Sequence, residues 1–328
     1  MREREPQITY VSALAPHLHR FVEEKRALGC RYRAPARLLA VFDRFLLERG
    51  VASPDLPRAL LEAWIARRPH ESFRTQQARI YLVRQLCWFL IRRGFAPYLL
   101  SPHLIPKGRS SFVPYIFTRE QIRRLLAAAD QIEPHPLSPR RETMFPLIFR
   151  LLYGCGLRVN EALHLQIRDV DLARGVLTIR EAKFGKDRLV PVAPSLAQGL
   201  RSYANTHLRQ QAATSPFFPA PDGGPFHDRT IHDMFRRLLW TCEISYQGRG
   251  KGPRLHDLRH TFAVHRLMLW HRDGADLGVA LPVLATYLGH VSLSGTQRYL
   301  RLTAEMYPDL IASLQAHHGQ VIPGREQP

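Results

Sequence analysis

The sequence is poor in cysteine and contains no long apolar run. Its 328 residues include four widely spaced cysteines and no C-x-x-C pair, which argues against a zinc ribbon and a disulfide scaffold; they are Cys30, Cys87, Cys155 and Cys242. We expect each to be a small buried residue in a reducing compartment. No run approaches the roughly 18 apolar residues of a membrane span, and the charged start "MREREPQITY" leads into no apolar signal segment. These absences predict a soluble cytoplasmic protein.

Acidic residues are scarce as well. Lys and Arg total 47 against 28 Asp and Glu, which gives a formal net charge of +19. Such an excess of one sign repels itself in the folded state, so we interpret it as a surface for an acidic partner. Nucleic acid is the first candidate and an anionic membrane the second.

The first hundred residues predict a small all-α domain over 1–100. Apolar residues recur at helical spacing in four segments joined by short connections. These segments are 10–29, 35–50, 53–68 (with Ser53 or Asp55 as the cap) and 74–94, and glycines end three of them. The arginines expected to be exposed, which either contact DNA or form a solvated basic face, are Arg31, Arg33, Arg74, Arg79, Arg92 and Arg93.

The rest of the chain predicts a linker and a second, mixed domain. Prolines and a Gly-Arg-Ser-Ser run mark a linker at 101–112, after which Thr118 opens a capping box with Gln121. A buried helix, a Gly-x-Gly break, a short helix and two strands around a polar tip follow, and then helices at 227–242, 256–271, 280–290 and 294–318. The fold class is therefore mostly α with a small β-hairpin or sheet, an α+β domain over 113–318 before a polar tail at 319–328.

The stretch "RLHDLRHTF" allows two incompatible interpretations. His256 and His260 are four residues apart with an acid after the first, as in the H-E-x-x-H pattern of zinc metalloproteases. Alternatively, His256 and Arg259 form half of a clamp for a phosphate. A zinc site needs a third ligand and a general base, Asp257 is shorter than the usual Glu, and Arg259 would repel a cation. We favour the phosphate clamp and assign His260 a structural role.

Four dispersed segments together carry a recognisable combination of residues: "YGCGLRVNEALHL", "REAKFGKDRLVPV", "HDLRHTFA" and "LGHVSLSGTQRYL". In this order they resemble the tyrosine recombinases, the phage integrase family, over the whole catalytic half. The helical first half resembles the DNA-clamping amino-terminal domain of that family only in type. The site residues that the resemblance implies are Arg158, Glu161, Lys183, His256, Arg259, His290 and Tyr299.

The chemistry of DNA strand exchange explains the central residues of this set. Tyr299 would be the nucleophile, because a phosphotyrosyl ester keeps the energy of the broken strand and the reaction can run backwards without metal or cofactor. Arg158 and Arg259 would neutralise the phosphate oxygens, since guanidinium groups are permanently charged and donate two parallel hydrogen bonds. We expect no metal and no cofactor.

The remaining roles concern protons and orientation. Lys183 at the hairpin tip would protonate the departing 5′-oxygen, with Lys186 as the competing candidate. His256 would accept the tyrosine proton or bind the phosphate, and His290 would donate to a phosphoryl oxygen. Glu161, at i+3 from Arg158 on one helical face, would orient that guanidinium. Taken singly, each of these residues is an ordinary surface or core residue.

The resemblance implies a site-specific DNA recombinase, an integrase or transposase of a mobile genetic element. Its partner would be double-stranded DNA, clamped between the two domains, with a homotetramer on two synapsed sites and a place for companion recombinases. It would lie at the nucleoid when bound to DNA. The alternatives are a type IB topoisomerase-like enzyme and a catalytically silent DNA-binding accessory protein. No small-molecule substrate is expected.

Two departures from the family pattern stand out. His290 follows Arg259 by 31 positions, which is more than expected, and we assign the extra length to a polar turn flanked by helices in "LWHRDGADLGVALP". Ala182 and Phe184, instead of glycines, flank Lys183. A final helix, about Ala304 to His317, has an apolar stripe that would pack on its own domain or on a neighbouring protomer.

Overall fold

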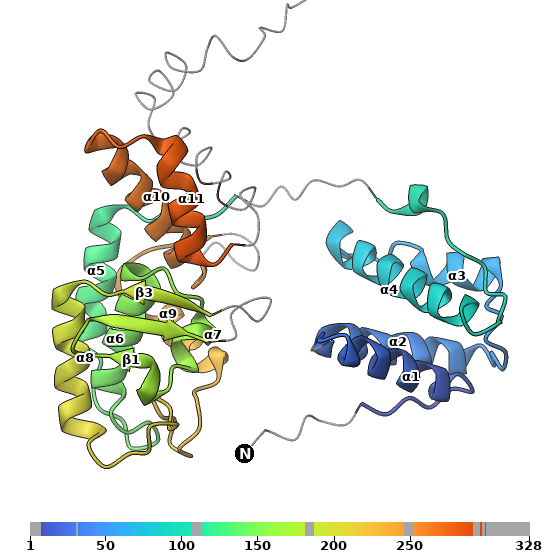
Figure 1. The fold of residues 1–328 in the computed structure, drawn as a ribbon, viewed down its shortest axis with the longest axis horizontal. Coiled ribbons are helices and arrows are strands. Elements are labelled where there is room, and N and C mark those ends of the chain that lie inside the picture. Colours follow the sequence, from blue (N-terminus) through green and yellow to red (C-terminus); the bar gives the residue numbers. More distant parts are fainter. Residues whose placement is uncertain are drawn as a thin grey trace, which may run out of the picture. The chain divides into compact units, whose positions relative to one another are not determined.

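The computed structural model describes residues 8–30, 32–106, 113–180, 187–245 and 252–290, together with Thr296 and Tyr299. The chain divides into two compact units, Met1–Phe112 and Val113–Pro328 (Figure 1). The described part of the chain is mostly helical and has one small sheet, which confirms the predicted fold class. No described helix is long and apolar enough to cross a membrane.

The amino-terminal unit is a four-helix domain with an aromatic core. Its helices are α1 (Ala15–Ala27), α2 (Arg33–Glu48), α3 (Arg58–Ile65) and α4 (Phe73–Ile91), followed by the short 3-10 turn η1 (Pro102–Leu104). Phe42 and Trp64 pack edge to face in its centre, with ring centroids 4.8 Å apart. Gly29 and Gly50 follow α1 and α2 at φ of +82° and +63°, so the predicted glycine stops are confirmed there.

Three sequence expectations in this unit are wrong. The third helix begins at Arg58, because Ser53 and Asp55 bond to each other and Asp55 also accepts the Ala96 amide, which leaves neither of them to cap a helix. Arg79 is buried, since Glu71 and the backbone carbonyls of Trp64 and Ala66 satisfy its guanidinium. Cys30 is exposed, whereas the other three cysteines are buried as expected.

The second unit wraps helices around a central helix and carries a three-stranded antiparallel sheet. The strands β1 (Val170–Asp171), β2 (Val176–Ile179) and β3 (Arg188–Pro191) pair in sequence order, with Leu177 opposite Val190. The helices and turns are α5 (Arg119–Asp130), α6 (Arg141–Gly154), α7 (Val159–Leu163), η2 (Ile167–Asp169), α8 (Pro194–His207), α9 (Asp228–Thr241), α10 (Asp257–Arg272) and α11 (Leu277–Leu288). The capping box of Thr118 and Gln121 is confirmed.

The sequence missed one helix of this unit. Helix α8 lies in a stretch where no helix was predicted, and its buried residues pack it against α6. The polar turn expected in "LWHRDGADLGVALP" is present at 273–276, where it separates the end of α10 at Arg272 from the start of α11 at Leu277. Figure 1 shows α10 and α11 side by side. The hairpin tip at 181–186 and the final segment 304–317 lie outside the described residues.

Candidate active site

Arg158 follows a tight turn between α6 and α7, and the residues packed around this turn require a glycine in it. After α6 the chain turns at Gly156, whose φ is +59°; a Cβ there would lie 2.5 Å from the Phe262 ring. The turn delivers Arg158 in extended conformation as the residue before α7. Its guanidinium donates to a Glu161 carboxylate oxygen at 2.6 Å and to the Gly289 carbonyl at 3.2 Å. Arg158 is therefore fixed, but not on a shared helical face with Glu161 as predicted.

Glu161 is the anion that holds several arginines in place. Its carboxylate accepts the backbone amide and the guanidinium of Arg158, and two further bonds from Arg188 at 3.0 and 2.8 Å. Burial by itself would raise the pKa of Glu161, but the hydrogen bonds and charges of Arg188 and Arg158 outweigh it and lower that pKa to about 2. Glu161 is thus ionised at any physiological pH.

Arg259 is buried with only 1% of its surface exposed. It donates at 2.6 Å to the carbonyl of Gly156 and also to the carbonyl of Leu288, the last residue of α11. Burial, followed by the nearby charge of Arg158, lowers the pKa of Arg259 to about 10, so it stays charged at neutral pH. Two guanidinium groups close enough to repel each other make this a place where an anion is favoured.

The two predicted histidines lie beside this arginine pair. Desolvation, then the charges of Arg259 and Arg158, lower the pKa of His256, although the residue keeps solvent contact. The same causes lower the pKa of His290 to about 4. The Nδ1 atom of His290 lies 2.8 Å from the Thr296 hydroxyl. Both imidazoles are therefore neutral near pH 7, and the arginines carry the positive charge of the site.

Tyr299 is buried and points into the same cluster. It packs with residues of α10 and α11, and only 2% of its surface is exposed. Its ring stacks on His290 with centroids 6.0 Å apart, and its hydroxyl lies 3.0 Å from Nδ1 of His260. The His256 and His260 rings meet edge to face at 4.7 Å. His260 thus lies between His256 and the tyrosine.

Six of the seven predicted site residues therefore come together from α7, α10, the end of α11 and the segment beyond it: Arg158, Glu161, His256, Arg259, His290 and Tyr299. Lys183 lies outside the described residues, as does Lys186. Sequence reasoning missed Arg188 and His260. The i, i+4 spacing of His256 and His260 was a signal for the second, whereas nothing in the run around Arg188 pointed to Glu161.

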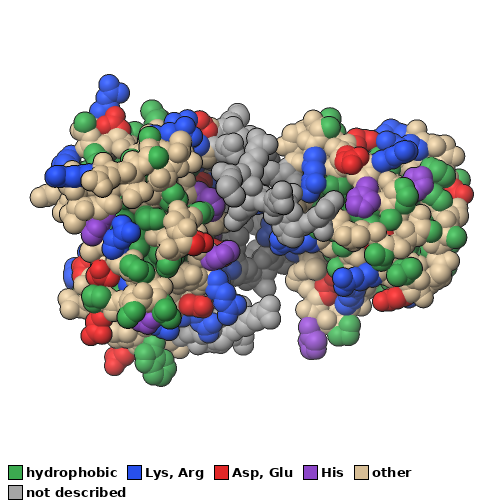
Figure 2. Space-filling view, turned by 90° about the horizontal axis from the view of Figure 1, so that it is seen from below, with side chains coloured by type: hydrophobic (Ala, Val, Ile, Leu, Met, Phe, Trp, Pro, Cys, Tyr) green, Lys and Arg blue, Asp and Glu red, His purple; other side chains and the backbone are tan. Residues whose placement is uncertain are grey.

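The arrangement suits a phosphate better than a metal. Among the described residues, no group of three or more His, Cys, Asp or Glu side chains is placed to hold a metal ion. The fixed charge of Arg259 next to His256 and His260 also opposes a cation. Figure 2 shows Lys and Arg side chains on the described surface of each unit, in keeping with the net charge of +19.

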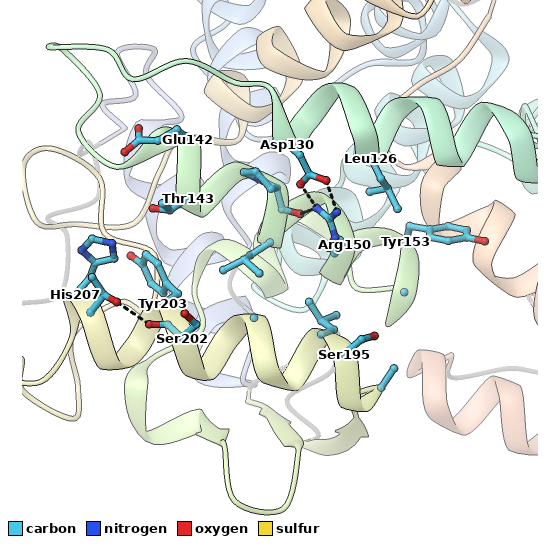
Figure 3. Close-up of a pocket in the computed structure, with 17 residues that line it drawn as sticks. Leu126, Asp130, Glu142, Thr143, Arg150, Tyr153, Ser195, Ser202, Tyr203 and His207 are labelled. Carbon is cyan, nitrogen blue, oxygen red and sulfur yellow. Dashed lines mark hydrogen bonds and ion pairs between the residues drawn. The ribbon is translucent and has the colours of Figure 1, made fainter.

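A groove lies elsewhere in the second unit. Its volume is about 690 Å³, and residues of α5, α6 and α8 line it, including Leu126, Leu147 and Tyr203. Figure 3 shows Arg150 paired with Asp130 at this groove, with bonds of 2.7 Å. None of the predicted site residues lines it.

The comparisons with known proteins identify the family of the chain. The family model described as phage integrase family matches residues 116–306. The chain is 33% identical over 310 residues to the integrase/recombinase y4rB of Sinorhizobium fredii, covering 93% of this chain and 98% of that protein. It is 34% identical over 207 residues to the tyrosine recombinase XerA of Thermococcus kodakarensis, covering 63% of each.

A solved structure shares the fold. The Tn1549 transposon integrase, in complex with transposon right end DNA, aligns with a TM-score of 0.64 at 14% identity, covering 92% of this chain and 98% of that one. Arg158, His256, Arg259, His290 and Tyr299 all lie within the segment that the family model matches. The chain therefore belongs to the phage integrase family, the tyrosine recombinases.

Proposed function

We propose that the chain is a site-specific DNA recombinase that cleaves and rejoins strands through a 3′-phosphotyrosine on Tyr299. The observation that carries the proposal is the position of Tyr299: the residue is buried, its hydroxyl lies 3.0 Å from His260, and the guanidinium of Arg259 is near enough to stabilise its phenolate form. Arg158 and Arg259, both anchored on backbone carbonyls, support the proposal as the groups that would bind the phosphate. Little reorganisation is then needed when charge develops in the transition state.

In the proposed reaction, the Tyr299 oxygen attacks the phosphorus and the 5′-oxygen leaves. Arg158 and Arg259 each donate to non-bridging oxygens and neutralise the added charge. His256 and His290, being neutral, serve as hydrogen-bond donors to the same group. We propose Lys183 as the acid that protonates the departing 5′-oxygen. Because the phosphotyrosyl bond keeps the energy of the broken strand, the chemistry calls for no metal and no cofactor.

Glu161 acts one step away from the reaction in this proposal. It touches no reacting atom, but it fixes Arg158 and, through Arg188, connects the start of β3 to α7. Arg188 also donates to the Tyr287 carbonyl near the end of α11. These bonds connect α7, β3 and α11 next to the two guanidinium groups.

We assign DNA binding to the amino-terminal unit as well, with 1–100 as the DNA-binding domain, 101–112 as the linker and 113–318 as the catalytic domain. An exposed stripe on α4 supports this: Tyr81 and Trp88, one helical heptad apart, keep 50% and 48% of their surface accessible. Exposed arginines lie at both ends of the stripe, at positions 74 and 92. Basic residues interleaved with aromatic ones are typical of a nucleic-acid surface.

Helix α2 extends this surface. Its exposed face carries Arg33, Arg37 and Arg44 at helical spacing. The Tyr32 hydroxyl, directly before α2, donates to Gln85 in the middle of the α4 stripe at 3.3 Å, so the two faces adjoin. Neutralisation of several phosphates by such a surface makes binding steeply dependent on salt.

The biological setting follows from the relatives. The names of y4rB and of the Tn1549 integrase support an integrase or transposase of a mobile element. We propose a homotetramer that synapses two sites, with room for companion recombinases, because exchange of two duplexes needs four cleavages. In the cell the DNA-bound enzyme would lie at the nucleoid.

A covalent-trapping experiment tests the function. Protein is incubated with a short duplex that is nicked next to the cleavage position, so that the released end diffuses away and the adduct accumulates. The wild-type chain should give a protein–DNA adduct, and Tyr299→Phe should give none. Adduct formed by the Phe variant would refute the nucleophile, and no adduct from the wild type on its own site would refute the function. Supplying two sites distinguishes a recombinase, which yields joined recombinant products, from a topoisomerase.

A further inference from the structure

We propose that His260, to which the sequence assigned only a structural role, accepts the phenolic proton of Tyr299 when the strand is cleaved. This inference rests on the proposed function and adds a catalytic residue to it. The geometry carries it: the Tyr299 hydroxyl and Nδ1 of His260 are 3.0 Å apart, a normal hydrogen-bond distance. A base must be within such reach of the proton that it takes.

The position of His260 in the fold makes this contact well defined. It lies in the first turn of α10, next to Arg259, whose side chain is anchored on the Gly156 and Leu288 carbonyls. Tyr299 belongs to the apolar cluster that α10 and α11 form. Both partners are thus held by packing, and the hydroxyl has little freedom to turn away.

The two other imidazoles of the site are less suited to this step. His290 approaches Tyr299 by stacking, with ring planes inclined by 22°, and its Nδ1 is within 2.8 Å of the Thr296 hydroxyl. The ring of His256 meets that of His260 edge to face at 4.7 Å, and its pKa is lowered chiefly by desolvation and then by Arg259 and Arg158. A neutral imidazole next to two guanidiniums is a weak base, better used as a donor to phosphate.

The protons and bonds balance over the cycle. In cleavage, the Tyr299 oxygen forms its bond to phosphorus as its proton moves to Nδ1 of His260, and the phosphorus–5′-oxygen bond breaks as Lys183 protonates that oxygen. In rejoining, the 5′-hydroxyl gives its proton back to Lys183 and attacks phosphorus. The phenolic oxygen then leaves with the proton from His260. His260 must start neutral, with its hydrogen on Nε2.

The same helix supplies a matched control. His265, farther along α10, also has Nδ1 3.0 Å from a tyrosine hydroxyl, that of Tyr153. Tyr153 lines the groove between α6 and α8, which none of the predicted site residues lines. A replacement of His265 therefore removes a histidine–tyrosine hydrogen bond of the same length from the same helix without touching the proposed chemistry.

The experiment measures the rate of adduct formation by the full chain on the nicked duplex, from pH 6 to 9, for wild type, His260→Asn, His260→Ala and His265→Asn. Asn keeps a hydrogen-bonding group near the position of Nδ1 but cannot take up a proton. We expect both His260 variants to be slower by about 10²- to 10⁴-fold at pH 7. Their rates should rise with pH, since hydroxide must then remove the proton, and added imidazole should partly restore His260→Ala. His265→Asn should stay within about threefold of wild type.

Two results would overturn the proposal. One is a His260→Asn rate close to wild type with His260→Ala slow, which means that the hydrogen bond alone matters. The other is rescue of His260→Ala by a duplex with sulfur in place of the bridging 5′-oxygen. A thiolate leaves without a proton, so such rescue would assign His260 to the leaving group. Failure of the proposed function is separate, because it appears as no Tyr299-dependent adduct in the wild type.

Discussion

Replacement of Glu161 by Gln tests whether one carboxylate holds the arginine cluster together. Glu161 is 9% exposed and accepts bonds from Arg158 and Arg188, with Arg259 3.9 Å away. A pKa lowered from 4.5 to about 2 corresponds to about 3 kcal/mol of folding free energy, since a shift of one pKa unit is equivalent to about 1.4 kcal/mol. Gln removes this charge and turns an amide donor toward guanidinium donors. We expect the second unit to lose about 3 kcal/mol at pH 7.

The lowered pKa of Glu161 determines the pH range in which this carboxylate stabilises the fold. Because the folded-state pKa lies below the unfolded one, the folded protein binds fewer protons, and the stabilisation is complete above about pH 5. It is lost as the pH falls from there toward 2. The difference between wild type and Glu161→Gln should therefore be largest at neutral pH and shrink in acid.

Urea-dependent hydrogen exchange in peptides from α6 and α8 measures the stability of the second unit by itself. The control is Glu120→Gln, which removes an exposed carboxylate that pairs with Arg123 on α5, and it should change the stability by less than about 1 kcal/mol. If Glu161→Gln is no more destabilising than Glu120→Gln, or if its effect is the same at pH 3 as at pH 7, the assignment of Glu161 as the organising anion is wrong.

Two further predictions concern the amino-terminal unit. Arg79→Leu should destabilise it by about 3 to 5 kcal/mol in the same exchange measurement on α4 peptides, because Glu71 would stay buried without its partner. The control Arg92→Leu breaks an exposed pair with Glu24 and should change the stability by less than about 1 kcal/mol. Equal effects of the two variants would contradict the burial argument. Trp88→Ala should weaken DNA binding about fivefold or more without changing how steeply the affinity falls with salt, since it removes an apolar contact, whereas Arg74→Ala should lower that salt slope by about one. The control is Trp240→Ala, on α9 of the other unit, where the tryptophan is 86% exposed. A loss of affinity as large as that of Trp88→Ala would remove the reason for assigning the α4 stripe to DNA.

Much of the fold could be predicted from local pattern. Helices with one apolar face and a glycine stop, such as the one ended by Gly50, are specified within a short window. The capping box at Thr118 is equally local. By contrast, α8 was missed because nothing in its sequence marks it strongly, and its packing against α6 stabilises it. Ser53 and Asp55 carried a valid cap signal, but their side chains bond elsewhere.

By itself, the sequence determined which residue types are present and in what order, which was enough to predict a phosphate chemistry around Arg158, Arg259 and Tyr299. Only the tertiary structure decided which of these side chains contact one another. The bond between His260 and Tyr299 joins residues 39 apart, and the bonds from Arg188 to Glu161 join residues 27 apart. Such contacts depend on how α10, α11 and β3 pack against their neighbours. Hydrophobic periodicity shows which face of one element is buried, but it does not specify which residue of another element packs there.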